Sequence, residues 1–521
     1  MTRQALQAAP NVYNAAPYPL LAYADAHPAR HAAIARLMEL PVAPVETARY
    51  LEIGSAIGGH LLPLAMSYPR AHFTGIDLAE EQVAQANASA RELGLENITF
   101  VQADILDYQP EPGAFDYVVA HGIYSWIAPE IRDALLALVA RALASEGLGY
   151  VSYNTFPGWH SLMAVRRLLQ LGAGDLEDPV ERAGAGVDTV RFVQTLVPEN
   201  SPLRPVLDWY DEMEGDRFST VGVNHLVLVT HDELSEYNDP VYLLDFVAHA
   251  LHHGLQHVAD ADLSASFPNR LSRQQIEAVN KRIRSAEEFE QYLDFVSNRT
   301  FRRSLLVHQG RAANRRLRAI PTNLRGTWLR SRASVDGDLG LDSDGKTGFV
   351  APNEARITTE HRFSKAAFAE LIERAPADIP YEALLQAAAQ RAGGGPTDED
   401  ELLLCANLLS AFTYSSELVD LRTTASGIST LPGERPTVDP YARWMASRGE
   451  TLLTTRVFDR DPVKPVVARI LGLMDGLRTI DEIAALADQY LEARPGSSSS
   501  LEDAVVEVAE FAAGTGLLVP A

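Results

Sequence analysis

The stretch YLEIGSAIGGH, residues 50–60, decides the fold of this chain, because a β-rich run ends there in glycine. Glycine lets the chain turn sharply and lets backbone N–H groups approach a ligand closely. Further β-rich runs follow at 71–77, 98–104, 115–122 and 147–154, with amphipathic helical stretches at 61–68, 80–94 and 129–143. Strands that alternate with helices predict a parallel sheet covered on both faces.

The first three predicted strands each end in a group that a nucleoside needs. The first turns at Gly54, the second ends at Asp77 and the third ends at Asp104. The carboxyl ends of parallel strands form the ligand-binding edge of such a sheet, where a carboxylate at the second strand can accept both ribose hydroxyls. Asp104 is placed to reach an adenine amino group. The sequence therefore predicts an adenosine site, and the alternative is a sheet of this type with no ligand.

The glycine pattern distinguishes between nucleotide classes. A dinucleotide site would show G-x-G-x-x-G, but Ala56 replaces the second glycine. Glu52, Gly54 and Gly58 instead fit E-x-G-x-x-x-G, so the segment resembles class I methyltransferases that use S-adenosylmethionine (SAM). This resemblance implies SAM as the cofactor. Ala56 stands where that family usually has glycine and His60 where it often has asparagine, which are two departures beside the cofactor.

Later segments narrow the resemblance to bacterial protein-lysine methyltransferases that modify outer-membrane proteins, and to their relatives with a methyltransferase regulatory domain. YNAAPYP (13–19) resembles the N-terminal segment that folds over the cofactor in that family. The other matching segments are HGIYSW (121–126), SYNTFPGW (152–159), residues 231–263 and 290–308, and LGLMDGLRTIDEI (471–483), which resembles part of a winged-helix-like region.

The expected fold is α/β. It consists of a Rossmann-like class I methyltransferase domain, a mainly helical middle region and a C-terminal winged-helix-like α/β domain. We expect the SAM-binding domain over 1–265, with a helical insert at about 160–235, a middle or regulatory region over 266–395 and the C-terminal domain over 396–521. Within these, 172–186 and 392–401 suggest loops, 240–254 a helix, 255–263 a late strand, 269–332 a basic amphipathic region and 333–350 a β-hairpin.

The predicted cofactor residues come from the strand ends and from the resemblance. They are Tyr18, Glu52, Gly54, Ser55, Gly58, Asp77, Leu78, Asp104, Ile105 and His121.

The predicted catalytic residues are the aromatic side chains that follow the fourth and fifth strands. They are His121, Tyr124, Trp126, Tyr153 and Trp159. Aromatic rings attract a lysine ammonium group, and desolvation among them favours the neutral amine that accepts a methyl group. The alternative for the four Tyr and Trp rings is packing of the lid and core, and for His121 a structural hydrogen bond.

No metal site is expected. His249, His252 and His253 have helical spacing but lack the carboxylate of an HExxH pattern, so a polar helix face is the preferred interpretation. The acidic loop 336–345 does not fit the ligand positions of an EF-hand. The arginines of 299–332 are expected to pair within the chain.

Charge and composition limit the partners. The chain has 45 Lys plus Arg against 69 Asp plus Glu, a formal charge of −24. Such a surface disfavours nucleic acid and anionic membranes and favours cationic partners. The single cysteine, Cys405, and the absence of a signal-like or membrane-spanning apolar run predict a cytoplasmic protein without membrane insertion. A homodimer is compatible with the sequence.

The leading hypothesis is SAM-dependent N-methylation of lysine side chains on a protein substrate, such as a surface or outer-membrane protein. One alternative is a methyltransferase for a small molecule or peptide natural product, since no residue identifies the acceptor. Another is a non-catalytic SAM-binding regulator, which the departures at Ala56 and His60 suggest.

Overall fold

The computed structural model describes residues 16–219, 225–268, 271–311, 321–341, 345–487 and 500–520. The chain divides into two compact units, each assembled from three segments. The first comprises residues 1–22, 46–257 and 273–310, and the second comprises 23–45, 258–272 and 311–521. The three-domain division expected from the sequence stays a prediction.

A seven-stranded sheet forms the framework of the first unit, in the order β3-β2-β1-β4-β5-β7-β6, and its edge strand β6 continues past the unit boundary at residue 257. Its strands are β1 (Arg49–Ile53), β2 (His72–Asp77), β3 (Ile98–Gln102), β4 (Phe115–Ala120), β5 (Leu143–Asn154), β6 (Leu255–Asp260) and β7 (Phe301–His308). Strands β1 to β5 pair in parallel, and β7 runs antiparallel to β5. The order is that of a doubly wound nucleotide-binding sheet with β7 inserted between β5 and β6. The predicted Rossmann-like α/β fold is confirmed.

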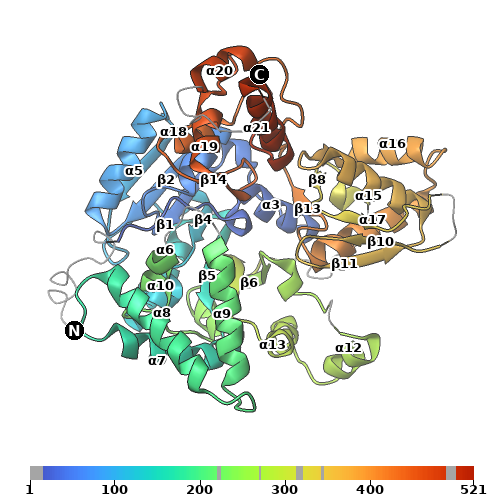
Figure 1. The fold of residues 1–521 in the computed structure, drawn as a ribbon. Coiled ribbons are helices and arrows are strands. Elements are labelled where there is room, and N and C mark those ends of the chain that lie inside the picture. The colour runs from blue at the N-terminus through green and yellow to red at the C-terminus, as the bar shows by residue number, and fades with distance from the viewer. Residues whose placement is uncertain are drawn as a thin grey trace. The chain divides into compact units, whose positions relative to one another are not determined.

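Apolar side chains on the central strands explain why they form the middle of the sheet. Leu51, Ile53, Val118 and Val151 are fully or almost fully buried in one core cluster. Strands buried on both faces need such continuous apolar runs. Helices α4 (Leu61–Ser67) and α5 (Glu80–Glu92) pack on β2 and β3, and α6 (Pro129–Ala142) packs on β4 and β5. These elements are blue to cyan in Figure 1.

Helices that follow β5 form a second apolar cluster in the first unit. They are α7 (Gly158–Ala173), α8 (Pro179–Leu196), α9 (Arg204–Ser219) and α10 (His225–Asp232), drawn in green shades (Figure 1). The predicted loop over 172–186 is wrong, because α8 begins at Pro179. The Asp178 carboxylate caps it by accepting hydrogen bonds from the N–H groups of Val180 and Glu181.

The remaining helices of the first unit and its short 3₁₀ turns complete the surroundings of the sheet. Helix α11 (Leu243–His252) leads into β6, which confirms the helix and late strand predicted over 240–263. Helices α12 (Arg273–Asn280) and α13 (Ala286–Ser297) precede β7. The 3₁₀ turns of this unit are η2 (Val45–Thr47), which begins at the unit boundary, and η3 (Tyr124–Trp126).

The second unit combines small sheets with helices. Its strand orders are β11-β10-β9, β12-β8-β13 and β14-β15. The strands are β8 (Trp328–Arg330), β9 (Ser334–Asp336), β10 (Thr347–Val350), β11 (Arg356–Thr359), β12 (Ile379–Pro380), β13 (Asp420–Arg422), β14 (Leu452–Thr454) and β15 (Arg460–Pro462). Its helices are η1 (Ala24–Ala26), α3 (Pro28–Leu37), η4 (Leu263–Ala265), α14 (Pro321–Leu324), α15 (Arg362–Arg374), α16 (Tyr381–Arg391), α17 (Asp398–Tyr414), α18 (Pro440–Ser447), α19 (Pro465–Leu473), α20 (Ile480–Ala487) and α21 (Leu501–Thr515).

The structure tests two predictions about this unit. The hairpin expected over 333–350 is confirmed, because β9 and β10 pair antiparallel. The loop expected over 392–401 is wrong in its second half, because a capping box at Thr397 and Asp400 starts α17 there. The winged-helix-like character of the C-terminal part stays a prediction. Among the described residues, no helix combines the length and apolar character that a membrane span requires.

Candidate cofactor and acceptor site

The loop after β1 crosses to the end of β2. The N–H groups of Gly54 and Ser55 both donate to the Ile76 carbonyl, at 2.8 and 3.0 Å. Gly54 has φ +78°, and a Cβ atom there would lie 2.2 Å from Cδ1 of Ile123. Only glycine fits, and the contact joins this loop to the HGIYSW segment after β4.

The Asp77 carboxylate fixes the same loop from the end of β2. Its Oδ2 accepts from the Ala56 N–H at 2.8 Å, and its Oδ1 accepts from the Ala79 N–H at 2.9 Å. The carbonyl of Asp77 accepts from the N–H of Ala103, beside Asp104 at the end of β3. The structure therefore brings the three predicted strand ends, at 54, 77 and 104, together on neighbouring strands.

Glu52 supplies a buried carboxyl group beneath the loop. Its Oε2 atom makes no hydrogen bond with the described residues. Burial, with a smaller contribution from the charge of Asp77, raises the pKa of Glu52 to about 8. Burial also raises the pKa of Asp77, against hydrogen bonds from backbone N–H groups that lower it. A cationic group bound nearby would favour the ionised carboxylates.

These residues fit a SAM molecule. The sulfonium and ammonium groups of SAM are cations, so they suit the buried carboxyl group of Glu52, whose Oε2 makes no hydrogen bond with the described residues. Asp77 has the chemistry to bind ribose hydroxyls. Leu78, at the end of β2, is 63% exposed although apolar, and Ile105 is half-buried against the core. Ser55 Oγ is a second buried atom that makes no hydrogen bond with the described residues.

The two residues that depart from the family pattern, Ala56 and His60, differ in their surroundings. Ala56 has φ +45°, a left-handed conformation that L side chains rarely adopt. His60 is buried, and its Nε2 lies 3.4 Å from the Tyr50 hydroxyl. Gly58 has φ +86°, and a Cβ there would lie 2.7 Å from the Phe100 ring.

The N-terminal segment lies against this glycine loop. A Cβ on Gly59 would lie 2.7 Å from the backbone nitrogen of Leu21. Nearer the N-terminus, the Ala16 carbonyl lies 2.6 Å from Nε2 of His231 on α10, and the Tyr18 ring is 5.6 Å from the His231 ring. The first residues of the YNAAPYP motif, 13–15, lie outside the described residues.

Serine hydroxyls tie the loop after β4 to the end of β5. Ser152 Oγ accepts from the Gly122 N–H at 2.8 Å, and Ser125 Oγ accepts from the Asn154 N–H at 2.9 Å. His121 Nδ1 lies 2.8 Å from the Tyr150 hydroxyl, and the two rings stack. The HGIYSW and SYNTFPGW segments thus form one layer at the carboxyl edge.

The predicted aromatic residues separate into two groups. Tyr124, Tyr153 and Trp159 are buried in the two apolar clusters. His121 and Trp126 are half-buried, and both rings lie near Phe301, at 6.0 and 6.5 Å between centroids. The Arg303 guanidinium lies 5.1 Å from the Phe301 centroid.

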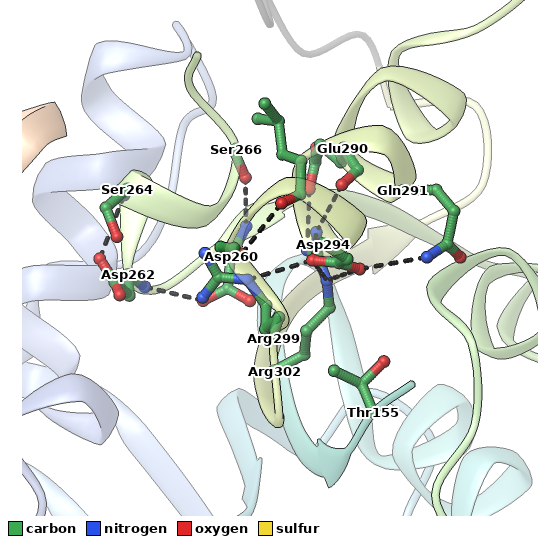
Figure 2. A network of polar contacts seen from close by, with 12 residues as sticks. Thr155, Asp260, Asp262, Ser264, Ser266, Glu290, Gln291, Asp294, Arg299 and Arg302 are labelled. Carbon is green, nitrogen blue, oxygen red and sulfur yellow. Dashed lines mark hydrogen bonds and ion pairs between the residues drawn. The ribbon is translucent and has the colours of Figure 1, made fainter. Parts of the chain in front are cut away.

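A buried ion network supports this layer from α13 and β7 (Figure 2). The guanidinium of Arg302 donates to both carboxylate oxygens of Asp294 and, at 2.9 Å, to Oε2 of Glu290. The turn between α13 and β7 receives the end of β5: the Thr300 carbonyl accepts from the N–H of Thr155, and the Arg299 carbonyl accepts from that of Gly158. The network therefore fixes the turn between α13 and β7, and this turn is hydrogen-bonded to the SYNTFPGW segment.

Sequence reasoning missed three residues of the site. Ile123 lies within the HGIYSW segment but was not predicted as a site residue, Gly59 is the second of two adjacent glycines, and Phe301 begins a strand that the sequence pattern did not predict. The GG pair was a usable signal for a close backbone contact. Phe301 required knowledge that β7 pairs with β5, where Phe301 lies opposite Asn154.

Comparisons with known proteins agree with this geometry. Residues 51–147 match the family described as "Methyltransferase domain", and residues 226–308 match "Predicted methyltransferase regulatory domain". The second match contains β6 and β7, which complete the sheet.

Similar proteins come from Rickettsia. The uncharacterised protein RP789 of Rickettsia prowazekii is 33% identical over 311 residues, which are 59% of this chain and 54% of that protein. The uncharacterised protein RP028 of the same organism is 29% identical over 238 residues, 46% of this chain and 93% of that protein. The chain thus spans about half the length of RP789.

A solved structure is similar in fold over almost the whole chain. PKMT2 from Rickettsia typhi, in complex with AdoHcy, has a TM-score of 0.82 at 24% identity and covers 97% of this chain and 100% of its own. AdoHcy is the product that SAM leaves after methyl transfer. The chain carries a SAM-dependent class I methyltransferase domain together with a methyltransferase regulatory domain.

Proposed function

We propose that the protein transfers a methyl group from SAM to the side-chain nitrogen of lysine residues in a protein substrate. The observation that carries this proposal is the half-buried aromatic group formed by His121, Trp126 and Phe301. It belongs to the layer that Ile123 joins to the cofactor loop at Gly54. The acceptor side of the site is therefore aromatic and directly adjoins the cofactor side.

Aromatic rings suit a lysine acceptor for two reasons. Their faces attract the ammonium form on arrival, and the guanidinium of Arg303 over Phe301 illustrates that this ring accepts a cation. Their apolar edges then favour the neutral amine, which alone has the lone pair for the reaction. Removing the proton from a free lysine at pH 7 requires about 4–5 kcal/mol, and desolvation lowers that amount.

The chain's residues divide the work of methyl transfer. SAM supplies an electrophilic methyl group on its sulfonium. Glu52 and Asp77 are proposed to bind the cofactor, and Trp126 and Phe301 to orient the acceptor and exclude water. His121, held by Tyr150, is the candidate for accepting the amine proton. The amine nitrogen forms the new N–C bond as the S–C bond of SAM breaks. The electron pair of the S–C bond stays on sulfur.

The test uses the full-length protein and SAM carrying a labelled methyl group. Cell-envelope proteins serve as acceptors in two forms, one native and one with its lysines chemically dimethylated beforehand. We expect label in methyl-lysine after acid hydrolysis of the native sample and a large loss of label in the blocked sample. Label in small molecules alone, or equal label in both samples, contradicts the protein-lysine proposal.

Variants separate the two halves of the site. Trp126→Ala should reduce methyl transfer at least about tenfold while SAM affinity stays within about twofold, because the cation–π and apolar contacts concern the acceptor. Phe192→Ala, which removes a 62% exposed ring on α8, is the matched control and should keep both properties. SAM binding without turnover on any acceptor would instead favour a SAM-binding regulator.

A further inference from the structure

Three potential metal ligands, one from α6 and two from the end of α11, meet on the surface of the first unit. Asp133 on α6 points to His249 and His253 at the end of α11, which are one helical turn apart. The Asp133 Oδ1 atom lies 3.3 Å from Nε2 of His249 and 2.8 Å from Nε2 of His253. The candidate ligand atoms of all three residues lie within 4.8 Å of one another.

We propose that Asp133, His249 and His253 bind a divalent transition metal ion of the Zn²⁺ class, with the remaining coordination positions open to solvent. Two histidine nitrogens and one carboxylate oxygen are a ligand set that such ions use, and three protein ligands leave a position for water. Ligand atoms about 2.0–2.1 Å from a tetrahedral ion lie about 3.3 Å apart. Asp133 Oδ1 and His249 Nε2 already have this separation, and the remaining pairs, which lie within 4.8 Å, must adjust by side-chain rotation.

A second contact supports the site from behind. The Tyr124 hydroxyl lies 2.8 Å from Nδ1 of His249, the ring nitrogen that faces away from Asp133. Histidines that bind metals almost always have a hydrogen-bond partner on the other ring nitrogen, and this partner fixes the tautomer.

The three proposed ligands differ in the solvent exposure of their side chains. The side chain of Asp133 is 64% exposed, while those of His249 and His253 are 25% and 12% exposed. An ion can therefore approach from solvent and meet two histidines already oriented by the helix. The spacing of the histidines alone did not indicate this site, because the carboxylate comes from another helix, 116 residues earlier in the chain.

Metal binding would also change one hydrogen bond below the site. A metal on Nε2 of His249 requires the proton on Nδ1, so Nδ1–H donates to the Tyr124 oxygen. Tyr124 belongs to the HGIYSW segment, so the bound ion would connect α6 and α11 to the layer at the carboxyl edge.

Cobalt(II) provides a direct test, because it replaces zinc and absorbs visible light when it is coordinated. We expect the chelator-treated, full-length protein without a polyhistidine tag to bind one Co²⁺ with visible bands, and Zn²⁺ to displace it. Asp133→Asn and His253→Gln should abolish the bands. Tyr124→Phe should keep all three ligands and weaken the affinity by about 10–100-fold.

His252→Gln is the matched control, because His252 is an exposed neighbour on the same helix outside the three-ligand group. It should bind Co²⁺ as the unmodified protein does. Circular dichroism in the presence of chelator checks that each variant is folded. Absence of the bands in the unmodified protein, or an equal loss in His252→Gln, would overturn the proposal.

Discussion

The Glu52 carboxyl group is protonated in the folded protein over a pH range in which an ordinary glutamate is ionised, because burial raises its pKa from 4.5 to about 8. Between these values the folded state holds a proton that the unfolded state lacks. The free energy of unfolding must therefore fall as the pH rises through this window. Glu52→Gln removes this dependence. We expect its stability relative to the unmodified protein to increase from pH 5 to pH 8, measured by urea unfolding without SAM.

SAM should reverse the advantage of that variant, since a cationic ligand favours the ionised carboxylate. The affinity of the unmodified protein for SAM is expected to rise by up to about tenfold per pH unit below pH 8. Calorimetry in buffers of different ionisation enthalpy would detect the released proton, and Glu52→Gln should release less. Equal proton release by both proteins would mean that Glu52 does not meet the positive charges of SAM.

Ala56 carries a different kind of strain, because its backbone adopts φ +45°. A residue with a side chain pays roughly 1–2 kcal/mol in that conformation, and glycine does not. Glycine also gains entropy in the unfolded chain, so the net effect is smaller. Ala56→Gly should raise the free energy of unfolding by about 0.5–1 kcal/mol, measured by thermal or urea unfolding. A loss of stability would show that the surrounding contacts, not the backbone, set this conformation.

Single residues also show what the sequence can and cannot reveal. Glu52 and Asp77 were predictable because a motif fixes their distance from a strand end. The contact of Phe301 with His121 and Trp126 was not predictable, since it joins segments about 175 residues apart. The buried state of Tyr124 and Tyr153 was equally hidden, because aromatic side chains serve cores and binding sites with the same chemistry.

Among the elements, β7 carries a fully buried charge. Arg302 is fully buried and is held by Asp294 and Glu290. Removing one partner of a buried ion pair leaves an uncompensated charge and typically costs about 3–5 kcal/mol. We expect a loss of that size for Arg302→Met in urea unfolding, with faster hydrogen exchange at Thr155 and Gly158. Arg273→Ala breaks the exposed pair with Glu277 and should cost less than about 0.5 kcal/mol.

The N-terminal segment offers a second test at this scale. A methyl group on Gly59 would contact the backbone of Leu20 and Leu21 at 2.7–3.0 Å, and overpacking of this kind costs about 1–3 kcal/mol. Gly59→Ala should therefore speed hydrogen exchange over residues 16–22 and weaken SAM binding, while β1 stays protected. The control is Gly394→Ala, where an added Cβ meets no atom within 4 Å. Unchanged exchange over 16–22 would show that the segment adapts without detaching.

Predictions of helices and strands failed where residues typical of loops or surfaces instead serve tertiary packing. The glycines of 172–186 suggested a loop, yet a Cβ on Gly186 would lie 2.8 Å from the Leu169 carbonyl, so glycine there permits close packing of α7 on α8. Strand β7 escaped prediction because its arginines indicated a basic amphipathic region. Strands β1 to β5 were predictable because their apolar runs and intervening helices repeat at regular distances.

At the scale of the whole molecule, the formal charge of −24 predicts how a basic substrate is captured. Long-range attraction is screened within about 8 Å at physiological ionic strength, whereas contacts inside the site are screened less. For a lysine-rich protein acceptor, raising the salt from 0.05 to 0.5 M should increase KM several-fold and leave kcat within about twofold. A neutral acceptor peptide is the control. A fall in kcat with unchanged KM would place the salt effect on a later step.

Overall organisation was only partly accessible from the sequence. Alternating strands and helices predicted the nucleotide-binding sheet. The assembly of each unit from three separated segments was not predictable, because pairing between distant segments depends on tertiary contacts.

The position of β7 between β5 and β6 has a consequence for how this protein is made. The match to the methyltransferase family ends at residue 147. A nascent chain of that length contains only part of the sheet. Until residue 308 emerges, one long edge of β5 lacks its neighbour, and unpaired edges of this kind invite association with other chains. Protein fragments cut at the family boundaries should accordingly aggregate. Fragments that stay in solution must retain β7, the last strand of the sheet to be synthesised.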